Sequence, residues 1–312
     1  MVKCYPFVSV VMPVYNAGLT VRQSIESVIG QTYKNWELVV VNDGSTDNTW
    51  SILQDLAGGD RRIRLVDLGR NCGMSNARNA GANISNGEFL AFLDGDDLWL
   101  PSKLEVQIKF HSCHPSCVIS HTGFYRLAHD HVLREPWNER LLTPHWQKQG
   151  CMLPILYWKN VIATLTVMIK RDIFLSLGGF DPSIWGTEDQ DLWIRVALNG
   201  NIFGFVNKKL ALYRVGETSV SNLTGRYKGA KKRILSKHVL HNKSLSRAMI
   251  RKAYAYYYRH FGALYLKKGS YKLARLYFLK SLSYECISFL GATTIMHLFP
   301  IRPRARWHRV KH

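Results

Sequence analysis

Short apolar runs alternate with polar turns and helix-like segments along the first hundred residues of the chain. The runs at 7–14, 36–41, 63–68 and 89–93 are rich in Val, Ile, Leu and Phe and predict strands, and those at 7–14 and 89–93 are typical of the middle of a sheet. Strands that alternate with helices through short connections are typical of a doubly wound, mostly parallel sheet. We therefore expect an α/β fold.

The segments between these runs predict the helices of that fold. Asn16 is expected to cap a helix that continues to Gln31, and Ser45 or Thr46 to cap a short helix toward Leu56. Further helices are expected at 71–82, from 101 onward and after 186.

The pattern is less regular in the next hundred residues. Strand-like segments are found at 118–127 and 161–170, and the segment 128–160 between them predicts a long irregular loop rich in Trp, His and Pro. Two runs, 203–206 and 210–214, predict a hairpin-like pair.

Charge divides the chain into two parts. The net charge is +20, yet residues 1–225 hold 21 Lys and Arg against 21 Asp and Glu. Residues 226–312 hold the other 21 basic residues and a single acid, Glu285. This shift predicts a boundary near Gly225, between a neutral body (1–225) and a basic helical region (226–312).

Three carboxylates follow the fourth apolar run. Asp94, Asp96 and Asp97 lie within four residues, where they repel one another unless a cation lies between them. Such oxygen ligands suit Mg²⁺ or Mn²⁺ shared with substrate phosphates. The alternative is a solvated acidic turn before the helix that starts near Pro101.

Five motifs stand at the expected strand ends and at one later helix start. The dinucleotide-binding G-x-G-x-x-G and the P-loop are both absent from the first βα turns. The motifs present are PVYNAG (13–18), NDGSTD (42–47), NCGMSNARNAG (71–81), LDGDD (93–97) and GTEDQDLWIR (186–195). In this order they closely resemble family 2 glycosyltransferases of the GT-A fold, over residues 7 to about 221.

The resemblance implies a nucleotide-sugar site. Pro13 and Tyr15 would line the nucleotide pocket, Asp43 would hydrogen-bond a uracil-like base, and Arg78 would reach the nucleotide or its diphosphate. For Asp43 the alternative is an Asx turn before Gly44, and for Arg78 a surface salt bridge.

The acidic motif would hold the cation and the sugar. Asp94 and Asp96 match the DXD positions, with Asp96 as ligand of Mn²⁺ or Mg²⁺ and Asp94 directed toward the ribose and the metal. Asp97 would support them or bind the sugar. Arg214, in a segment (212–221) that resembles the closing segment of non-processive members, would meet the diphosphate.

Glu188 and Asp189 match the family's catalytic acidic pair, with Asp189 as general base for an acceptor hydroxyl. The resemblance then implies an inverting transfer of one sugar from a UDP-sugar, in cell-surface polysaccharide or lipopolysaccharide assembly. The QxxRW motif and transmembrane helices of processive synthases are missing from the sequence. The alternative for this pair is two acids favoured by a helix dipole.

The basic region has a pattern of its own. Residues of about 251–285 nearly match the spacing of one tetratricopeptide-like hairpin, and 287–312 form an apolar and basic tail. We expect this region to meet an anionic membrane surface, with a lipid-linked or other glycan as acceptor. A solvated appendage that serves solubility is the alternative.

Two rival functions stay open at this stage. One is an inactive nucleotide-sugar-binding scaffold, and the other a basic nucleic-acid-binding protein, although no nucleic-acid-reading motif is present and no nucleic acid is expected. Scattered cysteines and the lack of a visible signal peptide predict a cytoplasmic enzyme. The basic region 226–312 predicts that the enzyme is peripheral at the inner face of the membrane.

Overall fold

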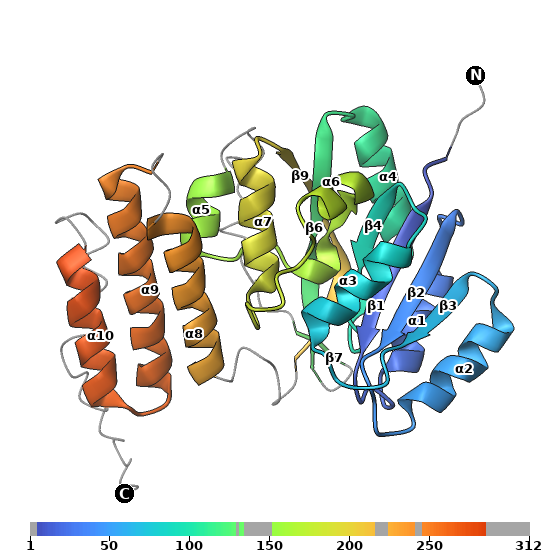
Figure 1. Cartoon of the computed structure of the whole chain (residues 1–312), viewed down its shortest axis with the longest axis horizontal. Helices are drawn as coiled ribbons and strands as arrows, with labels where there is room; N and C mark the ends of the chain where they lie inside the picture. Colours follow the sequence, from blue (N-terminus) through green and yellow to red (C-terminus); the bar gives the residue numbers. More distant parts are fainter. Residues whose placement is uncertain (1–4, 129–130, 134–151, 216–223, 241–244, 285–312) are drawn as a thin grey trace, which may run out of the picture. The chain divides into compact units, whose positions relative to one another are not determined.

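The structure is a computed structural model that describes residues 5–128, 131–133, 152–215, 224–240 and 245–284 (Figure 1). Its contacts divide the chain into two compact units, 1–230 and 231–312, which are treated separately below. Among the described residues no helix is both long and apolar enough to cross a membrane. The predicted boundary near Gly225 and the tail at 287–312 remain predictions, and the tail lies outside the described residues.

A large mixed sheet forms the centre of the first unit. Its strands are β1 (Val8–Val14), β2 (Trp36–Asn42), β3 (Ile63–Asp67), β4 (Phe89–Phe92), β5 (Leu98–Trp99), β6 (Cys117–Ala128), β7 (His131–Leu133), β8 (Met168–Lys170) and β9 (Ile202–Arg214). They lie in the order β3-β2-β1-β4-β8-β6-β9-β5, with β7 beside β6. The block β3-β2-β1-β4 is parallel, and β8 is antiparallel to β4. The predicted α/β class with a mostly parallel sheet is confirmed.

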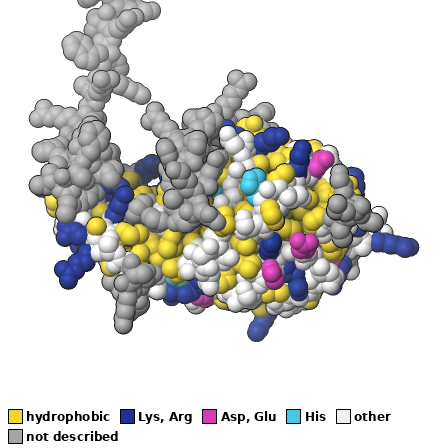
Figure 2. Space-filling model, turned by 90° about the horizontal axis from the view of Figure 1, so that it is seen from above, with side chains coloured by type: hydrophobic (Ala, Val, Ile, Leu, Met, Phe, Trp, Pro, Cys, Tyr) yellow, Lys and Arg dark blue, Asp and Glu magenta, His cyan; other side chains and the backbone are white. Residues whose placement is uncertain are grey.

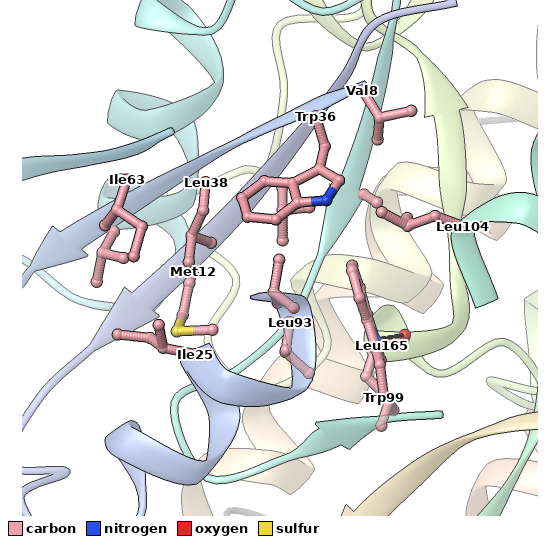
Figure 3. Packing of buried hydrophobic residues seen from close by; sticks show 14 of the residues in the cluster. Val8, Met12, Ile25, Trp36, Leu38, Ile63, Leu93, Trp99, Leu104 and Leu165 are labelled. Atoms are coloured by element: carbon pink, nitrogen blue, oxygen red, sulfur yellow. Dashed lines mark hydrogen bonds between the residues drawn. The ribbon is translucent and has the colours of Figure 1, made fainter. Parts of the chain in front are cut away.

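Helices cover both faces of the sheet because the strand side chains alternate in direction. The helices of this unit are α1 (Val21–Ile29), α2 (Thr49–Gly59), α3 (Met74–Ile84), α4 (Lys103–Cys113), α5 (Met152–Trp158), α6 (Arg171–Ser176) and α7 (Glu188–Leu198). Alternate residues of β1, such as Val10 and Met12, pack with α1, α2 and α4 in the main core, part of which Figure 3 shows. Val39 and Val41 of β2 point the other way, toward Ala77 of α3.

The predicted helix caps were wrong. Helix α1 begins at Val21, after Thr20 rather than Asn16, and α2 begins at Thr49. Asn16 adopts a left-handed conformation (φ 49°), and its side-chain oxygen accepts a hydrogen bond of 2.8 Å from the backbone N–H of Thr46. The predicted capping residues therefore tie two loops together instead of starting helices.

Three further expectations need correction. Residues 161–170 form a 3₁₀ turn, η2 (Thr164–Thr166), and the short β8 rather than one strand. The expected hairpin at 203–214 is one continuous strand, β9, which runs parallel to β6 with register shifts. Helix α5 occupies part of the predicted loop 128–160, whose residues 129–130 and 134–151 lie outside the described part.

The described part of the basic region is helical, as predicted. It contains α8 (Thr224–Ile234), the π-helical turn η4 (Leu235–Leu240), α9 (Arg247–Lys267) and α10 (Tyr271–Tyr284). Helices α9 and α10 lie side by side as a hairpin (Figure 1). Phe278 packs against Gly262, where a Cβ atom would meet the ring at 2.9 Å, and the Ser281 hydroxyl donates to the Ala255 carbonyl at 2.9 Å. The likeness to a tetratricopeptide repeat remains a prediction.

On the face shown in Figure 2, Lys and Arg side chains are spread among hydrophobic and neutral ones, and Asp and Glu are few.

Candidate active site

The candidate site lies at the edge of the sheet where β1, β2 and β4 end. Parallel strands bring their carboxyl ends to one edge, and in open α/β sheets ligands bind there. The loops after β1 and β2 are joined by the Asn16–Thr46 bond and by the N–H of Asn16, which donates to the Ser45 hydroxyl at 3.0 Å. Within this loop Tyr15 is 49% exposed, whereas Pro13 is buried in β1. An exposed ring at this edge is able to stack on a base.

Asp43 holds the start of α3. Its two carboxylate oxygens accept from the backbone N–H groups of Cys72 and Gly73 at 2.7 and 2.9 Å. The next residue, Gly44, has a left-handed conformation (φ +69°), and a Cβ there would lie 2.4 Å from the backbone of Arg70, so this position requires glycine. The buried Asp43 therefore fixes the loop that leads to α3, a task that sequence reasoning did not assign to it.

Arg78 joins two of the acidic motifs. One guanidinium nitrogen donates to both oxygens of Asp94, at 2.7 and 2.9 Å, and another donates to Glu188 at 2.9 Å. Only 2% of Arg78 is exposed, and its Nε is buried without a hydrogen-bond partner among the described residues. Burial alone would lower the pKa of this guanidinium, but the two carboxylates raise it above its usual range. Arg78 is thus a fixed positive charge between β4 and α7.

Asp96 and Asp97 differ in their surroundings. Asp97 is buried, and one of its oxygens accepts from the backbone N–H of Arg214 at 2.8 Å. Asp96 reaches solvent, but crowding protein atoms desolvate its carboxyl group and Asp94 repels its charge, so that its pKa rises to about 6. Burial and the two neighbouring aspartates also raise the pKa of Asp97.

Arg214, at the end of β9, also contacts the acidic loop that follows β4. Its Nε donates to the backbone carbonyl of Asp96 at 2.9 Å, and its terminal nitrogen donates to Gln23 at 2.8 Å.

Glu188 and Asp189 open helix α7 and face different partners. Glu188 is buried against Arg78, and burial raises the pKa of this carboxyl although Arg78 opposes the rise. Asp189 is partly exposed, and one oxygen accepts from the side-chain amide of Asn160 at 2.6 Å and from the Thr164 hydroxyl at 3.4 Å. Asn160 and Thr164 were missed because they lie in or beside a segment without a recognisable pattern.

A pocket of about 100 Å³ lies beside this acidic pair. Its walls are the start of α3, from Cys72 to Asn76, together with Pro182, Trp185, Gly186 and Glu188. Glu188 and the aromatic ring of Trp185 therefore line the same pocket.

The side chains present could hold the implied cation only together with oxygen ligands from a bound substrate. Among the described residues, no group of three or more His, Cys, Asp or Glu side chains is arranged to hold a metal alone. Mg²⁺ in phosphate sites commonly uses one or two carboxylates together with substrate phosphates. Asp96 suits the role of such a carboxylate ligand, because its negative charge is destabilised in the folded chain. Asp94 could also bind the cation, but its oxygens already accept hydrogen bonds from Arg78.

Comparison with known sequences identifies the family to which the chain is similar. Residues 9–171 match the model of glycosyl transferase family 2. TuaG of Bacillus subtilis, named as a teichuronic acid biosynthesis glycosyltransferase, is 34% identical over 74% of this chain and 87% of its own length. WfgD of Escherichia coli, a UDP-Glc:α-D-GlcNAc-diphosphoundecaprenol β-1,3-glucosyltransferase, is 32% identical over 69% of this chain and 79% of its own length.

Solved structures share the fold. S. aureus TarS 1–349 in complex with UDP-GlcNAc superposes with a TM-score of 0.65 at 17% identity, over 88% of this chain and 81% of that one. The mannosyltransferase PcManGT from Pyrobaculum calidifontis, in complex with GDP-Man and Mn²⁺, gives a TM-score of 0.66 at 18% identity, over 94% and 79%. This chain is therefore a glycosyltransferase and belongs to glycosyl transferase family 2.

Proposed function

We propose that this enzyme transfers one sugar from a UDP-sugar to a hydroxyl of a glycan acceptor, with inversion at the anomeric carbon. UDP is favoured because the related WfgD is named for a UDP-Glc donor and TarS binds UDP-GlcNAc. The names of WfgD and TuaG, which specify a diphosphoundecaprenol substrate and teichuronic acid synthesis, support a lipid-linked acceptor in cell-surface polysaccharide assembly.

One observation carries the proposal. Arg78 contacts Asp94 at the end of β4 and Glu188 at the start of α7, although these carboxylates are far apart in the sequence. The donor-side aspartates and the acidic pair therefore share one site, with Asp189 next in the chain to Glu188. A reaction between a bound donor and an activated hydroxyl needs both groups within reach of the same carbon.

Asp189 is the proposed general base. Its carboxylate would take the proton of the acceptor hydroxyl while the hydroxyl oxygen bonds to the anomeric carbon and the bond from that carbon to the diphosphate oxygen breaks. Asn160 orients the carboxylate by a 2.6 Å hydrogen bond to one oxygen, and the backbone N–H of Gln190 donates to the other oxygen at 2.7 Å. A carboxylate oxygen can accept more than one hydrogen bond, so these contacts are compatible with a further bond from the incoming hydroxyl.

Other residues of the chain bind the donor in this proposal. Tyr15 would stack on the base, Asp43 would support the base pocket, and Arg214 would meet the diphosphate. Asp94, Asp96 and Asp97 would face the ribose, the diphosphate and the sugar. A bound Mn²⁺ or Mg²⁺, held by Asp96 and Asp94, would neutralise the charge that develops on the departing diphosphate.

A donor panel tests the proposal. The purified chain is incubated with UDP-, GDP- and dTDP-sugars and Mn²⁺, and the release of nucleoside diphosphate is measured with and without candidate lipid-linked acceptors. We expect slow hydrolysis of one UDP-sugar and faster release with an acceptor. A chain that binds UDP tightly but releases none from any donor would instead be an inactive donor-binding scaffold.

A further inference from the structure

The outward face of α10 combines leucines with positive charges. Its exposed large side chains are Tyr271 (71%), Leu273 (43%), Leu276 (45%) and Leu279 (49%). Lys272, Arg275 and Lys280 are exposed beside them on the same helix. We call these seven residues the α10 face.

This face is turned away from the hairpin partner. Phe278 and Ser281 contact Gly262 and Ala255 of α9. The buried residues of α10 are Ala274, Tyr277, Phe278 and Ser281. Leu276 and Leu279 are three positions apart, on the side of the helix opposite to these buried residues. Packing within the hairpin therefore does not explain why these two positions are leucine.

The charge around the face has one sign. Residues 226–284 contain 16 Lys and Arg and no Asp or Glu. A protein partner that needs both signs of charge would find no acid in this stretch, whereas an anionic lipid surface attracts every one of these side chains. Basic residues beside leucines and tyrosines are typical of helices that lie in the membrane interface, where leucines enter the acyl boundary and lysines stay among headgroups.

We propose that the α10 face docks on an anionic lipid bilayer, with the axis of α10 parallel to the surface. The helix has 14 residues, about 21 Å at 1.5 Å per residue, which is too short to span the hydrocarbon core of about 30 Å. The docking concerns this surface alone and does not depend on which donor or acceptor the enzyme uses.

Vesicle flotation of the full chain tests the proposal. Phosphatidylcholine vesicles with and without phosphatidylglycerol are compared at about 0.1 M and about 1 M salt, where the Debye length falls from ~10 to ~3 Å. We expect binding to the anionic vesicles at low salt, and much weaker binding at high salt or on neutral lipid. A chain that stays unbound on anionic vesicles at low salt contradicts the proposal.

Two variants locate the contact. Leu276→Gln with Leu279→Gln removes apolar contact and keeps the charge, and we expect at least tenfold weaker binding. Lys272→Gln, Arg275→Gln and Lys280→Gln together remove three charges, and at about 1 kcal/mol each the loss should be on the order of a hundredfold. Leu198→Gln, and Lys109→Gln with Lys208→Gln, are matched exposed controls in the first unit and should bind as the unchanged chain does.

Further measurements exclude other occupants of the face. Melting curves and donor hydrolysis should be unchanged in the α10 variants, and Leu276→Ser with Leu279→Ser replaces the first variant if it does not fold. Anionic-vesicle binding that persists at full strength in both α10 variants overturns the proposal. The proposal is also overturned if vesicle binding stays unchanged while the leucine variant abolishes a dimer of the chain. The same holds if vesicle binding stays unchanged while the charge variant abolishes RNA binding.

Discussion

At the scale of single residues, the acidic loop after β4 holds charge that the folded chain destabilises. Asp94 is paired with Arg78, and Asp97 receives a backbone N–H, but Asp96 carries a carboxyl whose pKa is raised to about 6. Groups kept in an unfavourable state commonly mark functional sites. A cation bound beside Asp96 together with a diphosphate would remove the unfavourable free energy of its ionised carboxyl group.

We therefore expect Asp96→Asn to increase the free energy of unfolding at pH 7.5 without metal. Asp96 is ionised there in both states, and its raised folded pKa means that ionisation opposes folding. Below the unfolded value near 3.8 the carboxyl is protonated in both states, so the gain should shrink as the pH falls from above 6 toward 4. Denaturant titrations in EDTA at pH 7.5 and pH 5 measure this gain in the free energy of unfolding. The exposed Asp55→Asn is the control, and an Asp96 variant less stable than the unchanged chain at pH 7.5 would refute this reading.

The same residue should set the pH dependence of cation-assisted binding. Protonated Asp96 is a poor ligand, so UDP affinity in Mn²⁺ should be constant well above pH 6 and fall below it. Isothermal titration from pH 5 to pH 8 tests this. An affinity that first falls near pH 4 would show that Asp96 does not hold the cation.

At the scale of elements, α3 and α7 are coupled through Arg78. The sequence indicated that Arg78, Asp94 and Glu188 belong to one site, because their motifs occur in a known order. The direct contacts could not be predicted, since they depend on how α3 packs against β1 and β2 and so brings Arg78 to Glu188 at the start of α7. The same holds for Asn160 and Thr164, which reach Asp189 only through the fold.

A double-mutant cycle measures this coupling. Lysine keeps the charge of Arg78 but lacks the fork that reaches two carboxylates, and Glu188→Gln removes one of them. We expect a coupling free energy of about 1–3 kcal/mol between Arg78→Lys and Glu188→Gln. The ion pair of Arg62 and Asp60, which is more exposed than that of Arg78, should give about 0.2–1 kcal/mol in the same cycle. Equal coupling in both cycles would mean that Arg78 does not join the two elements.

At the scale of the whole molecule, the strands of the parallel block were easier to predict from the sequence than the elements that follow it in the chain. Apolar runs with turn signals predicted every strand of the parallel block. Strands β1, β2 and β4 are buried along their whole length and are therefore mostly apolar, whereas β3 at the end of the sheet is partly exposed and carries Arg64 within its apolar run. Two elements were misjudged, β9 and α5 in the Trp-rich segment. Strand β9 carries Asn207 and two lysines at its middle, and α5 carries Pro154. Those local signals favour a turn, and long pairing with β6 overrides them in β9.

A prediction for the whole enzyme concerns the cation. Because the described residues hold no complete metal site, cation and nucleotide should bind together rather than singly. We expect UDP to bind at least tenfold more weakly in EDTA than in Mn²⁺, and Mn²⁺ alone to bind weakly. Equal UDP affinity in both conditions would remove the metal from the proposed mechanism.

The most direct test of the account compares Asp189→Asn with the unchanged chain, using UDP-sugar binding and transfer on the same preparations. Asparagine keeps the size and the contact with Asn160 but cannot take a proton at neutral pH, so only the transition state should suffer. We predict donor affinity within about twofold of the unchanged chain and transfer reduced by at least a hundredfold, with Asp55→Asn unaffected in both. Transfer that survives within about tenfold would show that the general base is not Asp189.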